Sequence, residues 1–149
     1  MGASLNIQTV LDYVEGHLGE DLSLERISKE FHYSKYYIAR AFTHTYGKSF
    51  YQYVKARRMT VAAQALAETA KPIVEVAYEA HYSSQQAFTL AFHQEYLCTP
   101  QEYRRKGVFS PKQPKLVLRA SKNNKGCLIN NSYLIRRNYL LMRKEGMAG

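Results

Sequence analysis

The chain has 149 residues, of which 46% are hydrophobic and 13% aromatic, a composition that excludes a disordered chain and allows a buried core. No apolar run approaches about 18 residues, so we expect no transmembrane span. The N-terminus MGASLNIQTV also lacks the basic and apolar segments of a secretion signal. Neither the two cysteines (Cys98 and Cys127) nor the five histidines show a metal-binding spacing, so we expect no metal and no cofactor.

The net charge of +9 predicts an anionic partner, but its distribution along the chain is uneven. Residues 107–149 contain nine basic residues and one acid, whereas residues 1–106 contain twelve and eleven. Within the balanced part, no acid occurs between Glu30 and Glu68, although six basic residues lie there. This one-signed stretch is better evidence for a nucleic-acid surface than the total charge.

Hydrophobic spacing predicts three helices before residue 48. The predicted helices and their N-caps are residues 5–18 after Ser4, residues 24–31 after Ser23 and residues 35–47 after Ser34. Gly47 ends the third helix as a left-handed residue, and His32 lies in the turn before it. Two short helices joined by a tight turn are typical of a helix-turn-helix unit, whose second helix can enter a DNA major groove.

The longest predicted element is one helix over residues 49–69, with Ser49 as its N-cap and no Pro or Gly before Pro72. At about 1.5 Å per residue it is about 30 Å long, close to the roughly 34 Å of one duplex turn. Arg57 and Arg58 lie in its middle, and we expect one of them to be structural, bonded to an acid or a backbone carbonyl.

The remaining helices form a second copy of the first motif. They begin at Pro72, at Ser83 or Ser84, and at Thr99-Pro100. HYSKYYIARAF and HYSSQQAFTLAF share their first three residues and their last two, and the second copy is one residue longer. Ile38 therefore corresponds to Phe88, and Arg40 to Leu90. We predict an all-α fold of about seven helices: two helix-turn-helix subdomains joined by a long linker helix, plus a C-terminal tail.

Residues 5–106 resemble the DNA-binding domain of the AraC/XylS family of bacterial transcription regulators, in its MarA/SoxS/Rob branch. The matching segments are YSKYYIARAF, YVKARRMTVAAQAL, PIVEVA, SSQQAFT and TPQEYRR, in the order and spacing of the family. The resemblance implies a cytoplasmic, nucleoid-associated activator that binds double-stranded promoter DNA as a monomer. It also implies two recognition helices in adjacent major-groove segments, RNA polymerase as a partner, and no enzyme activity.

The same resemblance assigns the site residues. The first helix-turn-helix contributes Ser34, Lys35, Tyr36, Ala39 and Arg40, of which the first two contact phosphate and the last three read bases. The second contributes Ser83, Ser84, Gln85, Gln86, Thr89 and Leu90, of which the two serines contact phosphate. Further candidate phosphate contacts are Lys48, Arg58, Arg104 and Arg105.

Several of these positions depart from the family pattern. Ala39 replaces a Gln, Leu90 an Arg and Tyr36 a Trp, and both turn positions carry His where the family prefers Gly. Arg40 is then the only Lys or Arg among the base-reading residues, which predicts that the first helix dominates readout. The departures leave an alternative open: a protein-interaction module with decayed base readout that binds DNA only non-specifically.

Residues 107–149 form the predicted basic tail. Its start, VFSPKQPKLVLRASKNNKG, is typical of a linker, and a short basic amphipathic helix is predicted from Ser132. Such a helix can dock on its own domain, on a second protomer, on an acidic lipid surface or on nucleic acid. Because the tail is too short for an effector domain, we expect control by abundance rather than by a small molecule.

Overall fold

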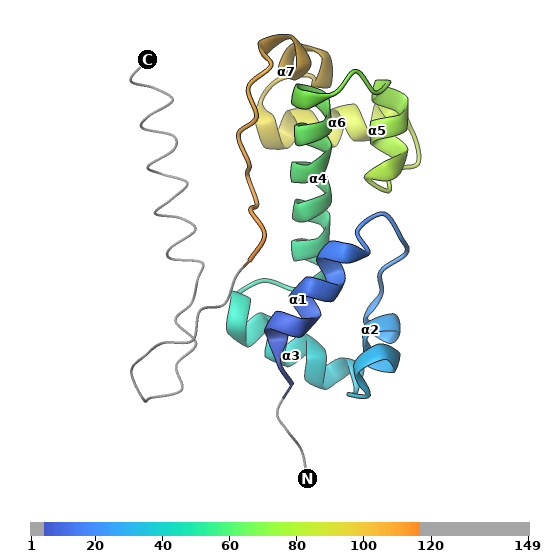
Figure 1. Ribbon diagram of the computed structural model, residues 1–149, viewed down its shortest axis with the longest axis vertical. Helices are drawn as coiled ribbons and strands as arrows, with labels where there is room; N and C mark the ends of the chain where they lie inside the picture. The colour runs from blue at the N-terminus through green and yellow to red at the C-terminus, as the bar shows by residue number, and fades with distance from the viewer. Residues whose placement is uncertain (1–4, 117–149) are drawn as a thin grey trace, which may run out of the picture. The chain divides into compact units, whose positions relative to one another are not determined.

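The computed structural model describes residues 5–116, and this part of the chain forms seven α-helices and no strands (Figure 1). The helices are α1 (Ile7–Gly16), α2 (Leu24–Phe31), α3 (Lys35–Tyr46), α4 (Phe50–Glu68), α5 (Ile73–Glu79), α6 (Gln85–Tyr96) and α7 (Pro100–Lys106). The predicted all-α class and helix order are confirmed. The helix predicted from Ser132 lies outside the described residues.

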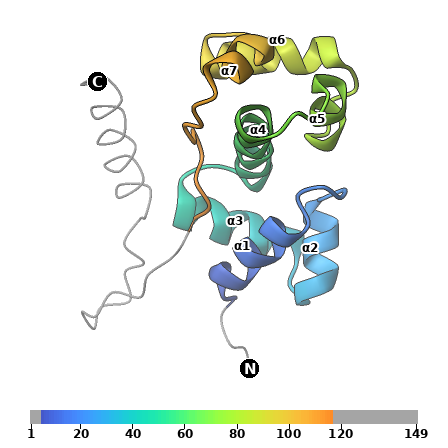
Figure 2. The same ribbon diagram turned by 45° about the horizontal axis from the view of Figure 1, so that its top comes forward.

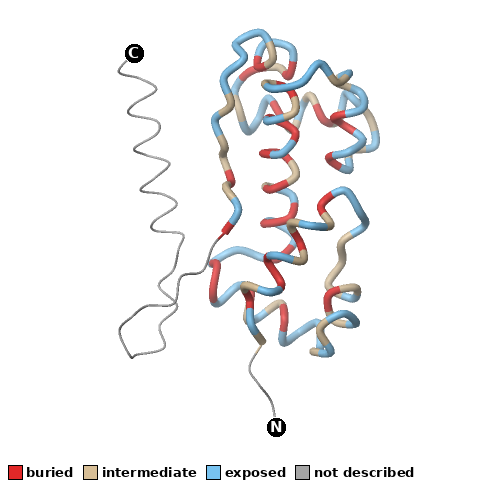
Figure 3. The backbone as a smooth tube through the Cα atoms, in the orientation of Figure 1, coloured by how far each residue is buried: buried red, intermediate tan, exposed pale blue. Residues whose placement is uncertain are grey.

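The chain divides into two compact units. Among the described residues, the N-terminal unit comprises residues 5–17, 22–53 and 115–116, and the C-terminal unit comprises Leu18–Asp21 and Val54–Pro114. Helix α4 begins in the first unit and continues in the second, and buried positions recur along it (Figure 3). Each unit therefore contains one predicted helix-turn-helix and part of the linker helix.

The N-terminal unit is built around α3, which contacts both α1 and α2. Its core combines aliphatic side chains of α1 and α2 with a cluster of aromatic rings. Phe42 is the centre of that cluster, because its ring lies within 5.7 Å of those of Tyr46, Phe50 and Tyr53. Burial of such large rings is a major source of stability in a small unit.

The C-terminal unit gathers α5, α6 and α7 around its part of α4 (Figure 2). Its fully buried rings, Phe88 and Phe92, pack on small residues of α4 such as Ala63. Small residues on α4 allow the helices to approach closely, so the large rings of α6 fill the space between them.

Local hydrogen bonds explain where the helices begin. The hydroxyl of Ser49 accepts from the backbone N–H of Gln52 at 3.1 Å, and the Gln52 amide oxygen accepts from the Ser49 N–H at 3.0 Å. Ser49 is therefore the N-cap of α4, as predicted, and the helix begins at the next residue, Phe50. Helix α1 differs from the prediction, because Asn6 rather than Ser4 caps it, through a bond to the N–H of Gln8.

The chain after α7 also differs from the prediction, since residues 109–116, called here the α4-bound segment, are packed. Gln113 is 7% exposed, and its backbone N–H donates to the Thr60 hydroxyl of α4 at 2.9 Å within the C-terminal unit. Leu116 is 2% exposed, and its N–H donates to the Tyr53 hydroxyl at 3.2 Å within the N-terminal unit. The sequence predicted a linker here because Gln113 and Leu116 lie among prolines and lysines, a composition that is typical of linkers.

Candidate nucleic-acid interface

The first helix-turn-helix consists of α2, a tight turn and α3. Ser34 caps α3 by accepting from the N–H of Tyr37, and Gly47 ends the helix with φ 85°. His32 ends α2 in the left-handed conformation, with φ 59°. The predicted boundaries and the positive φ at a non-glycine turn residue are both confirmed, because the turn needs this backbone geometry whichever residue occupies it.

Helix α3 has a buried face and a bare face. Ile38 and Phe42 are fully buried, while Tyr36 is 69% exposed and Arg40 is also exposed. Arg40 makes no hydrogen bond, ion pair or ring contact with any other residue of the described chain. Its guanidinium is therefore available, and a free guanidinium can bind the O6 and N7 atoms of a guanine with two hydrogen bonds.

Lys35, a predicted phosphate contact, has an acidic neighbour that the sequence did not reveal. Its ammonium lies 3.4 Å from a carboxylate oxygen of Glu25 in α2 and 5.5 Å from the ring centroid of Tyr36. The pKa of the Glu25 carboxyl is lowered by a hydrogen bond from the backbone N–H of Glu25 itself, and Lys35 lowers it further. Because this pair is exposed, it is weak, and a phosphate could displace the carboxylate.

The second helix-turn-helix consists of α5, a turn and α6. His81 has φ 66°, close to the value at His32. Ser84 caps α6 by accepting from the N–H of Ala87, which resolves the predicted choice between Ser83 and Ser84. Ser83 is exposed and lies just before the cap. Leu97 ends α6 with φ 61°, a left-handed residue that no turn signal in the sequence indicated.

The outward face of α6 carries no charge. Gln85, Gln86 and Leu90 are exposed, Thr89 is half-buried, and together these four side chains line an open depression. None of them makes a hydrogen bond or ion pair with another described residue. The structure thus brings the four predicted residues of the second helix together on one surface, as their helical spacing requires.

The arginines of α4 serve the fold. Arg57 is buried and donates to the carbonyl of Gln113 at 2.6 Å, and Arg58 donates to those of Leu18 and Glu20 at 2.9 and 2.6 Å. The sequence predicted that one of the two would be structural, but both bind backbone carbonyls. Arg58 was also a candidate phosphate contact, and its guanidinium is already engaged.

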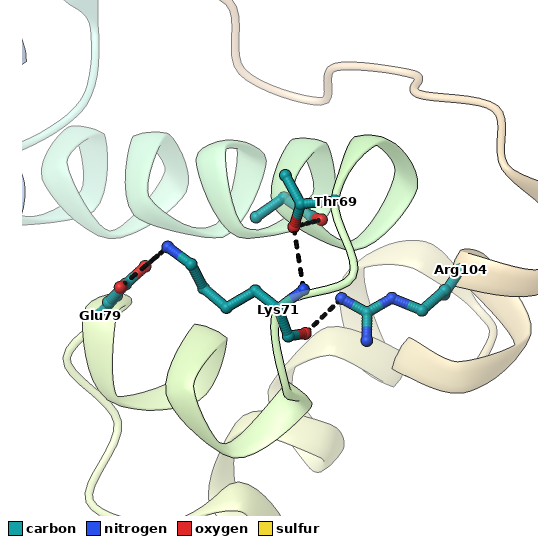
Figure 4. Close-up of polar contacts among 5 residues, drawn as sticks. Thr69, Lys71, Glu79 and Arg104 are labelled. Atoms are coloured by element: carbon teal, nitrogen blue, oxygen red, sulfur yellow. Dashed lines mark hydrogen bonds and ion pairs between the residues drawn. The ribbon is translucent and has the colours of Figure 1, made fainter.

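Arg104 has a similar structural position at the junction of α4 and α5 (Figure 4). Its Nε donates to the carbonyl of Leu66 at 3.1 Å, and its Nη2 donates to that of Lys71 at 2.5 Å. Lys71 in turn forms an ion pair with Glu79 at 2.8 Å. These bonds hold the end of α4, the start of α5 and α7 together, so Arg104 is also engaged.

The other two candidate phosphate contacts, Lys48 and Arg105, are exposed and make no polar contact with another described residue. Lys48 precedes the capping box of α4, and Arg105 lies in the last turn of α7. Hydrogen bonding thus separates the candidate cations into two groups. Arg58 and Arg104 bind carbonyls, whereas Arg40, Lys48 and Arg105 remain available to an anion.

No group of three or more His, Cys, Asp or Glu side chains within residues 5–116 could hold a metal ion. None of the helices in that range has the length and hydrophobicity needed to cross a bilayer.

Comparison with known families supports the helix-turn-helix assignment. The sequence profile of a helix-turn-helix domain family matches residues 27–106, more than half of the chain. This match begins in α2, ends at the last residue of α7, and so includes both recognition helices.

Curated relatives cover the same part of the chain. SoxS of Salmonella typhimurium is 34% identical over 98 residues, which are 66% of this chain and 92% of that protein. MarA of the same organism is 37% identical over 101 residues, covering 68% and 80%. Rob of that organism is 38% identical over 104 residues, covering 70% of this chain, but the match spans only 36% of Rob.

Solved structures agree with the fold. An AraC-type regulator from Chromobacterium violaceum is 26% identical, with a TM-score of 0.62, over 68% of this chain and 89% of that one. A dual transcriptional regulator from Escherichia coli is 25% identical, with a TM-score of 0.61, over 72% and 97%. These findings, with the two capped motifs and their bare outward faces, place this chain in the AraC/XylS family of bacterial DNA-binding transcription regulators, a family of regulators rather than enzymes.

Proposed function

We propose that the protein is a sequence-specific transcription activator that places α3 and α6 in adjacent major-groove segments of a promoter. The observation that carries the proposal is the bare outward face of each recognition helix, above all the unpaired guanidinium of Arg40. Buried anchors hold both helices in place, so these side chains can bind bases without disturbing the core. Helix α4, one uninterrupted element of 19 residues, joins the two motifs.

We further propose that α3 supplies most of the sequence discrimination. Arg40 is suited to a guanine, and Ala39 can contact only apolar groups such as a thymine methyl. Lys35 and Lys48 are exposed on the N-terminal unit and Arg105 on the C-terminal unit, where each can bind a phosphate. Ser34 and Ser84 each satisfy one backbone N–H group at their helix starts, and the other N–H groups of the first turn can bind an anion.

The proposal includes a monomeric protein, because one chain contains two reading helices, and RNA polymerase as the partner of the bound activator. A bacterial cytoplasmic location follows from the same proposed role. The regulatory role on which these three points depend is supported by the relatives, of which Rob is named a transcriptional regulator and SoxS a regulatory protein.

The test is a selection of bound sequences from a random duplex library with the full chain, followed by affinity measurements on the selected site. Arg40→Ala should weaken binding by about 1–3 kcal/mol and relax the preference at one base position. Lys48→Ala is the matched control, because loss of a phosphate contact should weaken all sequences equally and lower the salt slope by about one. Unchanged affinity and preference for the Arg40 variant would contradict its proposed role.

A second candidate is a protein-interaction module that binds DNA only non-specifically. The observation that favours it is the uncharged face of α6, on which Leu90 is 69% exposed. This candidate predicts strongly salt-dependent binding with no preferred sequence. Recovery of a defined motif in the selection would exclude it.

A further inference from the structure

The buried side chains show which positions of α6 are equivalent to which positions of α3. Ile38 and Phe42 of α3 are fully buried four residues apart, and so are Phe88 and Phe92 of α6. Leu90 therefore occupies on α6 the position that Arg40 occupies on α3, two residues after the first buried anchor. At 69% exposure its side chain is presented outward, as the guanidinium is on α3.

A single exposed leucine is common on protein surfaces, so its neighbours matter. Leu90 lines the open depression on α6 together with Gln85, Gln86 and Thr89, and this surface offers two amides, a hydroxyl and two apolar ends. No charged side chain belongs to it. The surface therefore combines hydrogen-bonding groups and an apolar group within about one and a half helical turns.

This combination matches one base pair better than the other in the major groove. Adenine offers an N7 acceptor and an N6 donor that an amide can bind with two hydrogen bonds, and thymine adds a methyl group suited to apolar contact. A guanine opposite Leu90 would lose water from its O6 and N7 acceptors without gaining a donor, which is unfavourable. An arginine at this position would have the opposite preference.

We infer that α6 selects A·T base pairs, with Leu90 contacting a thymine methyl group and Gln85 or Gln86 binding adenine. The inference rests on the proposed function and adds to it a stated base preference for α6. Discrimination by α3 through Arg40 and by α6 through Leu90 would then differ in chemistry, although the two helices share a register.

Replacement of thymine by deoxyuridine tests this directly, because it removes only the methyl group and preserves pairing. Thymines in the DNA site selected by the full-length protein are replaced one at a time. The half of this site that α6 binds is the half in which Arg40→Ala leaves the base preference unchanged. We expect about a fourfold loss of affinity at one position, the value for one buried methyl-sized group. Leu90→Ala should bind less tightly and lose this sensitivity to deoxyuridine.

Leu97→Ala is the matched control, because Leu97 is 79% exposed but lies at the end of α6, away from the depression. This variant should keep the full deoxyuridine effect. A G·C-rich half-site for α6, or equal deoxyuridine effects with and without Leu90, would overturn the inference while leaving the activator proposal intact. Selection of no motif by the unaltered protein would overturn both.

Discussion

The two helix-turn-helix motifs of this chain have similar backbone conformations and differ in the side chains on the outward faces of their recognition helices. Each has a serine cap, a left-handed histidine in its turn and a pair of buried anchors on its second helix. The outward face of α3 carries Arg40, Tyr36 and Lys35, whereas that of α6 carries amides and a leucine. Because caps, turns and anchors match, differences in DNA reading should come from the outward side chains themselves.

The motifs also differ in how their units are reinforced. In the C-terminal unit, Arg57, Arg58 and Arg104 all donate to backbone carbonyls, and the α4-bound segment adds the buried Gln113. Both units contain clustered aromatic rings, and the N-terminal unit adds Leu116 and an ion pair between Lys115 and Asp12 at 3.1 Å. These three arginines of the C-terminal unit thus serve structure, and its recognition face, formed by Gln85, Gln86, Thr89 and Leu90, carries no charged side chain.

The largest expected effect comes from removal of the α4-bound segment. A chain ending at Gly107 loses the burial of Leu116, worth about 1.5–3 kcal/mol, and leaves the guanidinium of Arg57 without the Gln113 carbonyl. Part of this is offset because the segment no longer has to be ordered. We expect the free energy of unfolding to fall by about 2–4 kcal/mol in urea titrations.

Hydrogen exchange would show which unit depends more on the segment. We expect the larger loss of protection in the C-terminal unit, where Arg57 and Thr60 both lose partners. A chain ending after Leu116 is the control, because it keeps the α4-bound segment, and it should be more stable than the chain ending at Gly107. Equal stability of the two shortened chains would mean that the α4-bound segment contributes nothing.

An intermediate effect on stability is expected from replacing the two turn histidines. These substitutions test whether the turns of the two motifs have the same backbone conformation. Both His32 and His81 have positive φ, so His→Gly at each should raise the free energy of unfolding by about 0.5–1 kcal/mol. Thermal denaturation of the single and double variants measures this. The controls are His44→Gly in α3 and His93→Gly in α6, where glycine should destabilise the helix.

Similar gains at the two turns would support a shared geometry. A gain at only one turn would mean that the motifs differ in backbone strain as well as in surface chemistry. Destabilisation by glycine at both turns would contradict the left-handed conformation itself.

The repeat, the caps and the helix boundaries could be predicted because they depend on local signals. Ser23, Ser34, Ser49 and Thr99 each precede an apolar periodic stretch, and each caps a helix. The inward and outward faces of α3 and α6 also follow from helical spacing alone. Contacts between distant residues could not be predicted, because the sequence does not indicate which arginine meets which carbonyl.

Arg58 and Arg104 show this limit most clearly. From sequence they were candidate phosphate contacts, like Arg105, but their partners lie 33 to 40 residues away along the chain. The packing of Gln113 and Leu116 was hidden for the same reason, since a proline-rich stretch without periodicity is typical of a linker. A buried position is revealed by periodicity only when its neighbours belong to a regular element.

The smallest expected effect concerns one tyrosine in each unit, the buried Tyr46 and the partly buried Tyr96, and appears only at high pH. Burial raises the pKa of Tyr46 to about 12 and also raises that of Tyr96 above its usual value of 10.0. Because the unfolded tyrosine ionises first, stability is unaffected below about pH 10 and falls as the pH rises toward the folded pKa. Each of the two tyrosines should lower the free energy of unfolding by under about 1 kcal/mol at about pH 10.5.

Tyr46→Phe and Tyr96→Phe should each reduce the loss of unfolding free energy at alkaline pH, measured by urea unfolding. Tyr51→Phe, at an exposed position, should not. A decline that persists unchanged in the Tyr46 and Tyr96 variants would mean that other groups govern alkaline unfolding.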